Sequence, residues 1–137
     1  MDEEMIKGLK EKMEGGSLTV DDIPNYLTAI CQIANENDDI KEEVEGWEKL
    51  MKFEVEDGPT GWMKVADGVF TAGDGDPDGE PDLTLQMNGS VGVGIFSGDV
   101  DATSAYMAGD LKVVGPLPDA VKFRTITEMV REAIEDM

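Results

Sequence analysis

The 137-residue sequence contains no histidine and a single cysteine, Cys31, and these two shortages exclude much of enzyme chemistry. Without an imidazole, the chain cannot form a Ser-His or Cys-His pair, a histidine metal site or a histidine general base. One cysteine cannot close an intramolecular disulfide, which fits a reducing compartment. Because Cys31 lies in an apolar helical stretch without a nearby cation, we interpret it as a packing residue and not as a nucleophile.

Basic residues and long apolar runs are also scarce. The chain has 11 Lys and Arg against 31 Asp and Glu, a net charge of −20, which argues against a nucleic-acid partner and against adsorption to anionic lipid. No stretch approaches the about 18 apolar residues that a membrane-spanning helix needs, and residues 1–14 carry no apolar signal segment. We therefore expect a soluble, cytoplasmic protein with no integral membrane association.

The acidic stretch DGDPDGEPD, residues 74–82, is a candidate metal site, because its aspartates have the spacing that opens a calcium-binding loop. The twelfth position of such a loop needs a bidentate glutamate, and here that position is Leu85. We therefore expect a solvated acidic turn and no bound metal. Among 31 carboxylates no pair stands out as a general acid and base, and no cofactor motif is visible. The sequence predicts a protein that is not an enzyme and has no cofactor.

The first 46 residues have the apolar spacing of helices and not of strands. A polar helix is expected over residues 2–14 and an amphipathic one over 19–35, which Thr19 and Asp22 begin with a capping box. A short third helix is expected within residues 38–47. We predict that residues 1–46 form a helical extension that packs on the rest of the chain and offers a surface to a protein partner.

From residue 47 onward, alternating apolar and polar residues predict strands. In MKFEVE the residues Met51, Phe53 and Val55 share one face, and the dipeptide Asp67-Gly68 predicts a tight hairpin in which Val65 faces Phe70. Further strands are expected within 81–88 and 111–114, and further helices within 90–98, 102–108 and 116–137. The prediction for residues 47–137 is an α+β domain with a single, largely antiparallel sheet covered by helices.

Several of these blocks together resemble the sterol carrier protein type-2 domain, a small lipid-binding fold. The blocks are the hairpin at Asp67-Gly68, PDLTLQM, the apolar helix that ends in FSG, and DVDATSAYMAGDLKVVG followed by a helix. Family members typically carry Asp-hydrophobic-Thr, Ser/Thr-Gly and an aromatic-Met/Phe-x-Gly-x-Leu-x-hydrophobic-x-Gly block, and the order and spacing match over about residues 47–135. The helix after Met87 departs from the family in being glycine-rich, and residues 1–45 are longer and more helical than its usual leading helix.

The resemblance implies a sterol-carrier-protein-2-like fold with an internal apolar tunnel for fatty acyl chains, acyl-CoA or sterols, guarded by the C-terminal helix as a lid. The expected function is noncatalytic binding or transfer of such a ligand. The alternative is an accessory protein-interaction module whose tunnel is closed. The residues expected to line or support the tunnel are Phe53, Val55, Val65, Phe70, Leu83, Leu85, Met87, Val93, Phe96, Tyr106, Met107, Leu111, Val113, Val121, Ile126, Met129 and Val130.

Overall fold

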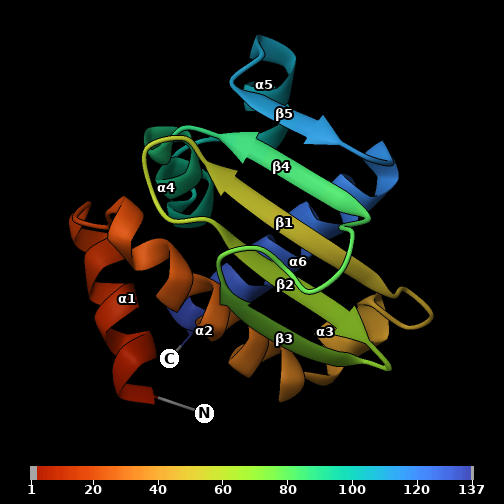
Figure 1. The fold of residues 1–137 in the computed structure, drawn as a ribbon. Coiled ribbons are helices and arrows are strands. Elements are labelled where there is room, and N and C mark those ends of the chain that lie inside the picture. Colours follow the sequence, from red (N-terminus) through yellow and green to blue (C-terminus); the bar gives the residue numbers. More distant parts are fainter. Residues whose placement is uncertain (1–2, 137) are drawn as a thin grey trace.

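Five strands form one sheet in the order β3-β2-β1-β4-β5, and helices cover one face of it (Figure 1). The structure is a computed structural model that describes residues 3–136. Within these residues the strands are β1 (Lys49–Val55), β2 (Gly61–Ala66), β3 (Val69–Asp74), β4 (Leu83–Met87) and β5 (Leu111–Val114). The helices are α1 (Glu3–Gly15), α2 (Ile23–Asn35), α3 (Asp38–Glu43), α4 (Gly89–Ser97), α5 (Ala102–Ala108) and α6 (Leu117–Glu135), with a 3-10 turn η1 (Val20–Asp22) before α2.

The sheet is mixed but largely antiparallel, as the sequence predicts. Neighbouring strands run antiparallel in every pair except β1 and β4, which are parallel. The connection from β3 to β4 crosses the outer face of β2 and β1, where Asp76 forms an ion pair with Lys52 at 2.8 Å. The acidic stretch 74–82 is therefore a crossover loop.

The alternation read from the sequence places one apolar face toward the helices. Met51, Phe53 and Val55 lie beside β4 in register with Leu83, Leu85 and Met87, and all six side chains are buried. The predicted hairpin is also present, because Asp67 and Gly68 adopt φ angles of 53° and 75°, which a two-residue turn of this kind requires. Its register pairs Val65 with Phe70, as predicted.

The helix boundaries follow the capping residues. The carboxylate of Asp22 accepts a hydrogen bond from the backbone N–H of Thr19 at 2.9 Å, so the predicted capping box is present, although it caps η1 and α2 begins only at Ile23. Asp101 accepts from the N–H of Ser104 at 3.2 Å at the start of α5, and Gly109, with φ 83°, ends that helix.

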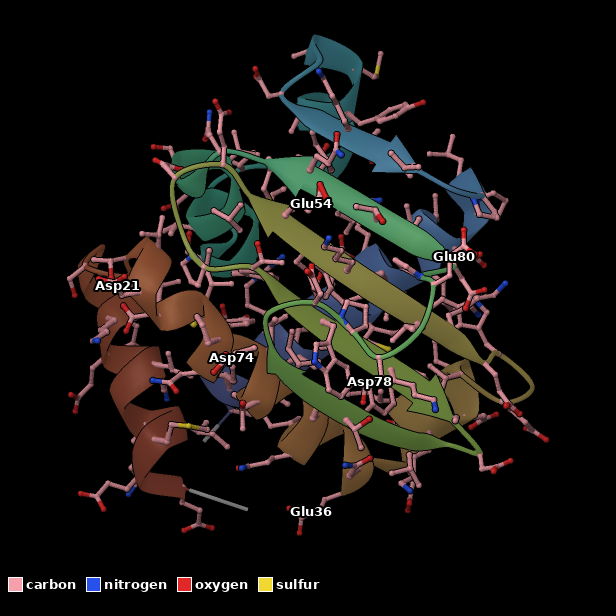
Figure 2. The ribbon with its side chains drawn as sticks, viewed as in Figure 1. Asp21, Glu36, Glu54, Asp74, Asp78 and Glu80 are labelled. Atoms are coloured by element: carbon pink, nitrogen blue, oxygen red, sulfur yellow. The ribbon has the colours of Figure 1, made fainter. Side chains whose placement is uncertain are left out.

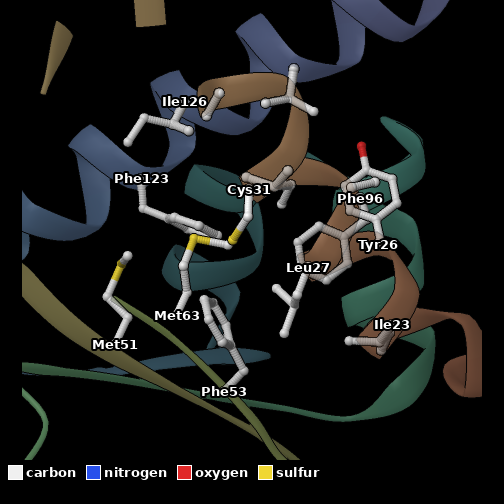
Figure 3. Packing of buried hydrophobic residues seen from close by; sticks show 14 of the residues in the cluster. Ile23, Tyr26, Leu27, Cys31, Met51, Phe53, Met63, Phe96, Phe123 and Ile126 are labelled. Carbon is white, nitrogen blue, oxygen red and sulfur yellow. The ribbon is translucent and has the colours of Figure 1, made fainter. Parts of the chain in front are cut away.

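The core lies between the inner face of the sheet and the helices (Figure 3). Helix α2 contributes Leu27, Ile30 and Cys31 to the same apolar cluster as the strands. Burial raises the pKa of the Cys31 thiol to about 12, so the side chain is a neutral packing group. The division into an extension over 1–46 and a domain over 47–137 stays a prediction, because α2 and the sheet share one core.

Helix α6 is the helix expected to act as a lid. Ile126, Val130 and Ile134 on its second half have no exposed surface, and the helix packs against α1, α2, α3 and α4. The second half of α6 is therefore part of the core in this structure, and its action as a lid stays a prediction. Figure 1 shows the helix running behind the sheet along much of its width.

Candidate functional site

A cavity of about 250 Å³ lies under the β4–β5 edge of the sheet, between the sheet and helices α4, α5 and α6. Most of its lining residues are apolar. The lining consists of Phe53, Leu85, Met87, Ile95, Phe96, Ala102, Thr103, Tyr106, Met107, Leu111, Val113, Leu117, Ala120, Val121, Phe123, Arg124 and Thr127.

The cavity forms because α5 is a short helix that packs mainly against the edge strand β5. Left-handed glycines stand on both sides of it: Gly98, with φ 90°, ends α4, and Gly109 ends α5 itself. These turns carry the chain out from the sheet and back again within a few residues. Helix α5 therefore roofs the space next to the first half of α6 without filling it.

The glycines inside α4 are not among the residues that line the cavity. A Cβ atom at Gly94 would lie 2.3 Å from Val100, and one at Gly92 would lie 3.3 Å from the sulfur of Met87. At Gly94 the absence of a side chain lets Val100 pack closely against α4. The residues that α4 presents to the cavity are the bulky Ile95 and Phe96. Behind Phe96, the ring of Tyr26 stacks on it with a centroid distance of 4.8 Å, which fixes that wall.

Two polar side chains of the lining, Arg124 and Thr127, already have partners. Arg124 Nη2 lies 3.1 Å from Asp101 Oδ1 and 3.4 Å from Glu128 Oε1, and the hydroxyl of Thr127 donates to the carbonyl of Arg124 at 2.7 Å. Hydrogen bonds from Ser104 hold the pKa of Asp101 below its usual value, so this carboxylate is ionised opposite Arg124. A lining that is mostly apolar favours an apolar ligand that forms few hydrogen bonds with the protein.

The structure brings part of the sequence-predicted set together around the cavity. The predicted residues that line it are Phe53, Leu85, Met87, Phe96, Tyr106, Met107, Leu111, Val113 and Val121. The others lie elsewhere: Val55, Val65, Phe70, Leu83, Ile126 and Val130 are buried in the core, and Val93 and Met129 are partly buried against it. Strand alternation identifies the inner face of a sheet, but it does not tell which strands lie over the cavity. Val65 and Phe70 belong to β2 and β3, which α2 covers.

Sequence reasoning missed eight lining residues, mostly on α5 and α6. They are Ile95, Ala102, Thr103, Leu117, Ala120, Phe123, Arg124 and Thr127. A signal for some of them exists, because positions 117, 120, 124 and 127 recur at helical spacing and so share one face of α6. This face escapes a search for apolar side chains because it includes an arginine and a threonine.

The acidic residues are spread over the molecule. Figure 2 labels carboxylates in η1, next to α2, in β1 and in the 74–80 region. Within residues 3–136 no group of three or more Cys, His, Asp or Glu side chains is arranged to hold a metal ion. In the same part of the chain, no helix combines the length and apolar character needed to cross a bilayer.

Comparison with known proteins places this geometry in context. A model of the SCP-2 sterol transfer family matches residues 27–128. Hydroxysteroid dehydrogenase-like protein 2 of Bos taurus is 28% identical over 100 residues, which are 72% of this chain and 23% of that protein. The chain thus spans less than a quarter of the length of this relative.

Solved structures show the same fold at low identity. A crystal structure of sterol carrier protein 2 aligns with a TM-score of 0.65 at 18% identity, over 80% of this chain and 95% of that one. A solution structure of palmitated SCP2L2 from Aedes aegypti aligns with a TM-score of 0.52 at 16% identity, over 74% of this chain and 90% of that one. The family match and the shared fold support lipid binding or transfer in general.

Proposed function

Because the chain belongs to the SCP-2 sterol transfer family, we propose that it carries a lipid or another long apolar ligand in the cavity beneath α5. The observation that carries this proposal is the cavity itself, whose apolar lining opens to the surface between α5 and α6. The ligand enters and leaves unchanged, since the charged groups at the cavity are bound to each other in the Arg124 ion pairs.

The size of the cavity favours one hydrocarbon chain as the ligand. Its volume of about 250 Å³ lies just below the roughly 300–1,000 Å³ that is typical of small-molecule pockets. Each buried methylene contributes about 0.8 kcal/mol, so about eight methylenes give roughly 6 kcal/mol before the cost of association. We therefore propose an acyl chain as the ligand, and the palmitated relative of the same fold supports this choice.

The alternative from the sequence, a closed tunnel with N-terminal helices that bind a protein, has less support. The cavity is present, and the apolar residues Ile6 and Leu9 of α1 are buried against the rest of the chain. These two side chains are therefore not accessible to a protein partner. A protein partner through residues 1–46 stays a prediction.

A cavity-filling substitution tests the carrier function. Ala120 lines the cavity from α6, and Ala120→Phe places a ring in the space that the acyl chain would occupy. We expect a fluorescent acyl probe to bind the unmodified protein saturably and with a chain-length dependence, and Ala120→Phe to weaken binding about tenfold or more.

The matched control is Ala133→Phe, which adds the same ring on the same helix away from the cavity lining. It should bind the probe like the unmodified protein, provided that circular dichroism shows both variants folded. Equal weakening by the two variants, or probe affinity that ignores chain length, would contradict the proposal.

A further inference from the structure

Exposed apolar side chains gather where the cavity reaches the surface. Within residues 3–136, six large apolar side chains are exposed, and four of them line the cavity. We call these four the apolar rim: Tyr106 (43% exposed), Met107 (80%), Leu117 (45%) and Val121 (53%). The rim comes from α5 and the first turns of α6, away from α1 (Figure 1). An apolar patch that is continuous with an apolar cavity is typical of an interaction surface.

The segment that carries the rim differs in charge from the rest of the molecule. Residues 101–124 contain three acidic side chains and three basic ones, Asp101, Asp110, Asp119, Lys112, Lys122 and Arg124, so their formal charge is zero. The whole chain carries −20, and all of this net charge therefore lies outside the segment. The carboxylates labelled in Figure 2 are likewise outside it.

Ion pairs further reduce the field at this end of the molecule. Arg124 is paired with Asp101 at 3.1 Å, and Lys122 is paired with Glu43 at 3.2 Å. Asp119 is buried and lies 3.2 Å from the Nζ atom of Lys49. The rim thus combines exposed apolar groups with a segment of zero formal charge, in which Asp101, Asp119, Lys122 and Arg124 are ion-paired.

From this combination we infer that the apolar rim docks on an electrically neutral lipid surface, such as a zwitterionic bilayer. The inference rests on the proposed carrier function, because docking there would place the cavity opening against the source of the ligand. An anionic bilayer would repel the −20 charge of the rest of the molecule. A second copy of the chain carries the same net charge, so repulsion also opposes a dimer through this face.

The experiment measures cosedimentation of the full chain with phosphatidylcholine vesicles and with vesicles of equal phosphatidylcholine and phosphatidylglycerol. We expect binding to the neutral vesicles and weaker binding to the anionic ones, with the difference shrinking as salt is added. Met107→Glu and Val121→Glu should each weaken binding to neutral vesicles about tenfold or more, because each puts a charge into the apolar contact.

The matched control is Val69→Glu. Val69 is 49% exposed and lies at the start of β3, on the opposite edge of the sheet from α5. This variant should bind neutral vesicles like the unmodified protein. Equal loss in Val69→Glu, no loss in Met107→Glu, or preference for the anionic vesicles would overturn the inference.

Probe binding in vesicle-free buffer separates this inference from the carrier function. Saturable probe binding without vesicle binding would refute the docking surface and leave the carrier function standing. Loss of both would refute both. Sedimentation analysis without lipid adds one further outcome: a dimer that Met107→Glu dissociates would assign the rim to a second copy and overturn the lipid assignment.

Discussion

Asp119 joins the start of α6 to the segment before the sheet. One carboxylate oxygen accepts a hydrogen bond from Trp47 Nε1 at 2.9 Å, and the other lies 3.2 Å from Lys49 Nζ. The residue is buried, so its loss leaves the indole N–H and a partly buried ammonium without their partner. The wall of the cavity that α6 forms is therefore fixed at its first turn.

Replacement of Asp119 tests this anchor. Asp119→Ala should lower the free energy of unfolding by about 1–3 kcal/mol, and Asp119→Asn by less, because the amide still accepts from Trp47. Urea denaturation measures the difference. Asp110→Ala, at an exposed position in the adjacent segment, is the control and should change stability by less than about 0.5 kcal/mol. A loss in Asp110→Ala as large as in Asp119→Ala would contradict the assignment.

Asp22 gives the molecule a pH-dependent contact. Burial acts to raise the pKa of this carboxyl, but hydrogen bonds from Lys12 and Thr19 outweigh it and hold the pKa below its usual 3.8. A folded-state pKa below the unfolded one stabilises the protein above the unfolded pKa, and this contribution disappears as pH falls through the folded value.

The expected result is a stability difference that depends on pH. Asp22→Ala should be less stable than the unmodified protein at about pH 7, by roughly 1 kcal/mol, and the gap should shrink as the pH falls through the lowered pKa of Asp22. Urea denaturation at about pH 7 and in acid measures the difference. Asp21→Ala, which changes the exposed neighbour, should show no such gap. A gap in Asp22→Ala that persists unchanged in acid would assign the loss to packing.

At the scale of elements, the sequence predicts turns and helix caps, which depend on neighbouring residues. It does not predict features that depend on residues far apart in the sequence, such as strand pairing. The Asp67-Gly68 turn and the Asp101 cap depend on a few neighbouring residues, and both are present. The parallel pairing of β1 with β4 joins segments about thirty residues apart and leaves no local pattern. The same limit applies to the cavity, because Leu85 and Val65 look alike in sequence and only the sheet order places one over it.

Truncation tests the role of α6 as a core element. Deletion of the residues after Thr125 removes the fully buried Ile126, Val130 and Ile134. Each such side chain contributes about 1.5–3 kcal/mol, so together they approach the 5–15 kcal/mol that is the usual total stability of a domain. We expect the truncated chain to lose cooperative unfolding and the far-ultraviolet signal of the sheet. Deletion of residues 136–137 alone should have little effect. Retention of the sheet with loss of ligand binding would instead support the lid.

At the scale of the whole molecule, family and fold are as the sequence resemblance implied, and the family match covers residues 27–128. That match begins within α2 and not at the expected boundary near residue 47. The ligand, the cytoplasmic location and the partner of residues 1–46 stay predictions, because family patterns report on the fold and function depends on the particular site.

The net charge of −20 has a measurable effect on the folded chain. Like charges repel more strongly in the compact state, and salt shortens the range of this repulsion from about 30 Å at 0.01 M to about 8 Å at 0.15 M. The melting temperature should therefore rise over this range. Near the isoelectric point of about 4.1 the net charge vanishes, and the salt effect should vanish with it. A melting temperature that falls with salt at neutral pH would contradict this account.

The parallel pairing of β1 with β4 has a consequence for synthesis on the ribosome. When the chain has emerged from the ribosome only as far as β3, β1 can pair with β2. The other edge of β1 has no partner until residues 83–87 of β4 emerge. That side presents unpaired backbone groups next to Met51, Phe53 and Val55, which is the combination that recruits strands from other chains. The nascent protein is therefore exposed to aggregation in the interval between the emergence of the hairpin and that of β4, and substitutions that slow the pairing of β4 should lower the yield of folded protein before they lower its stability.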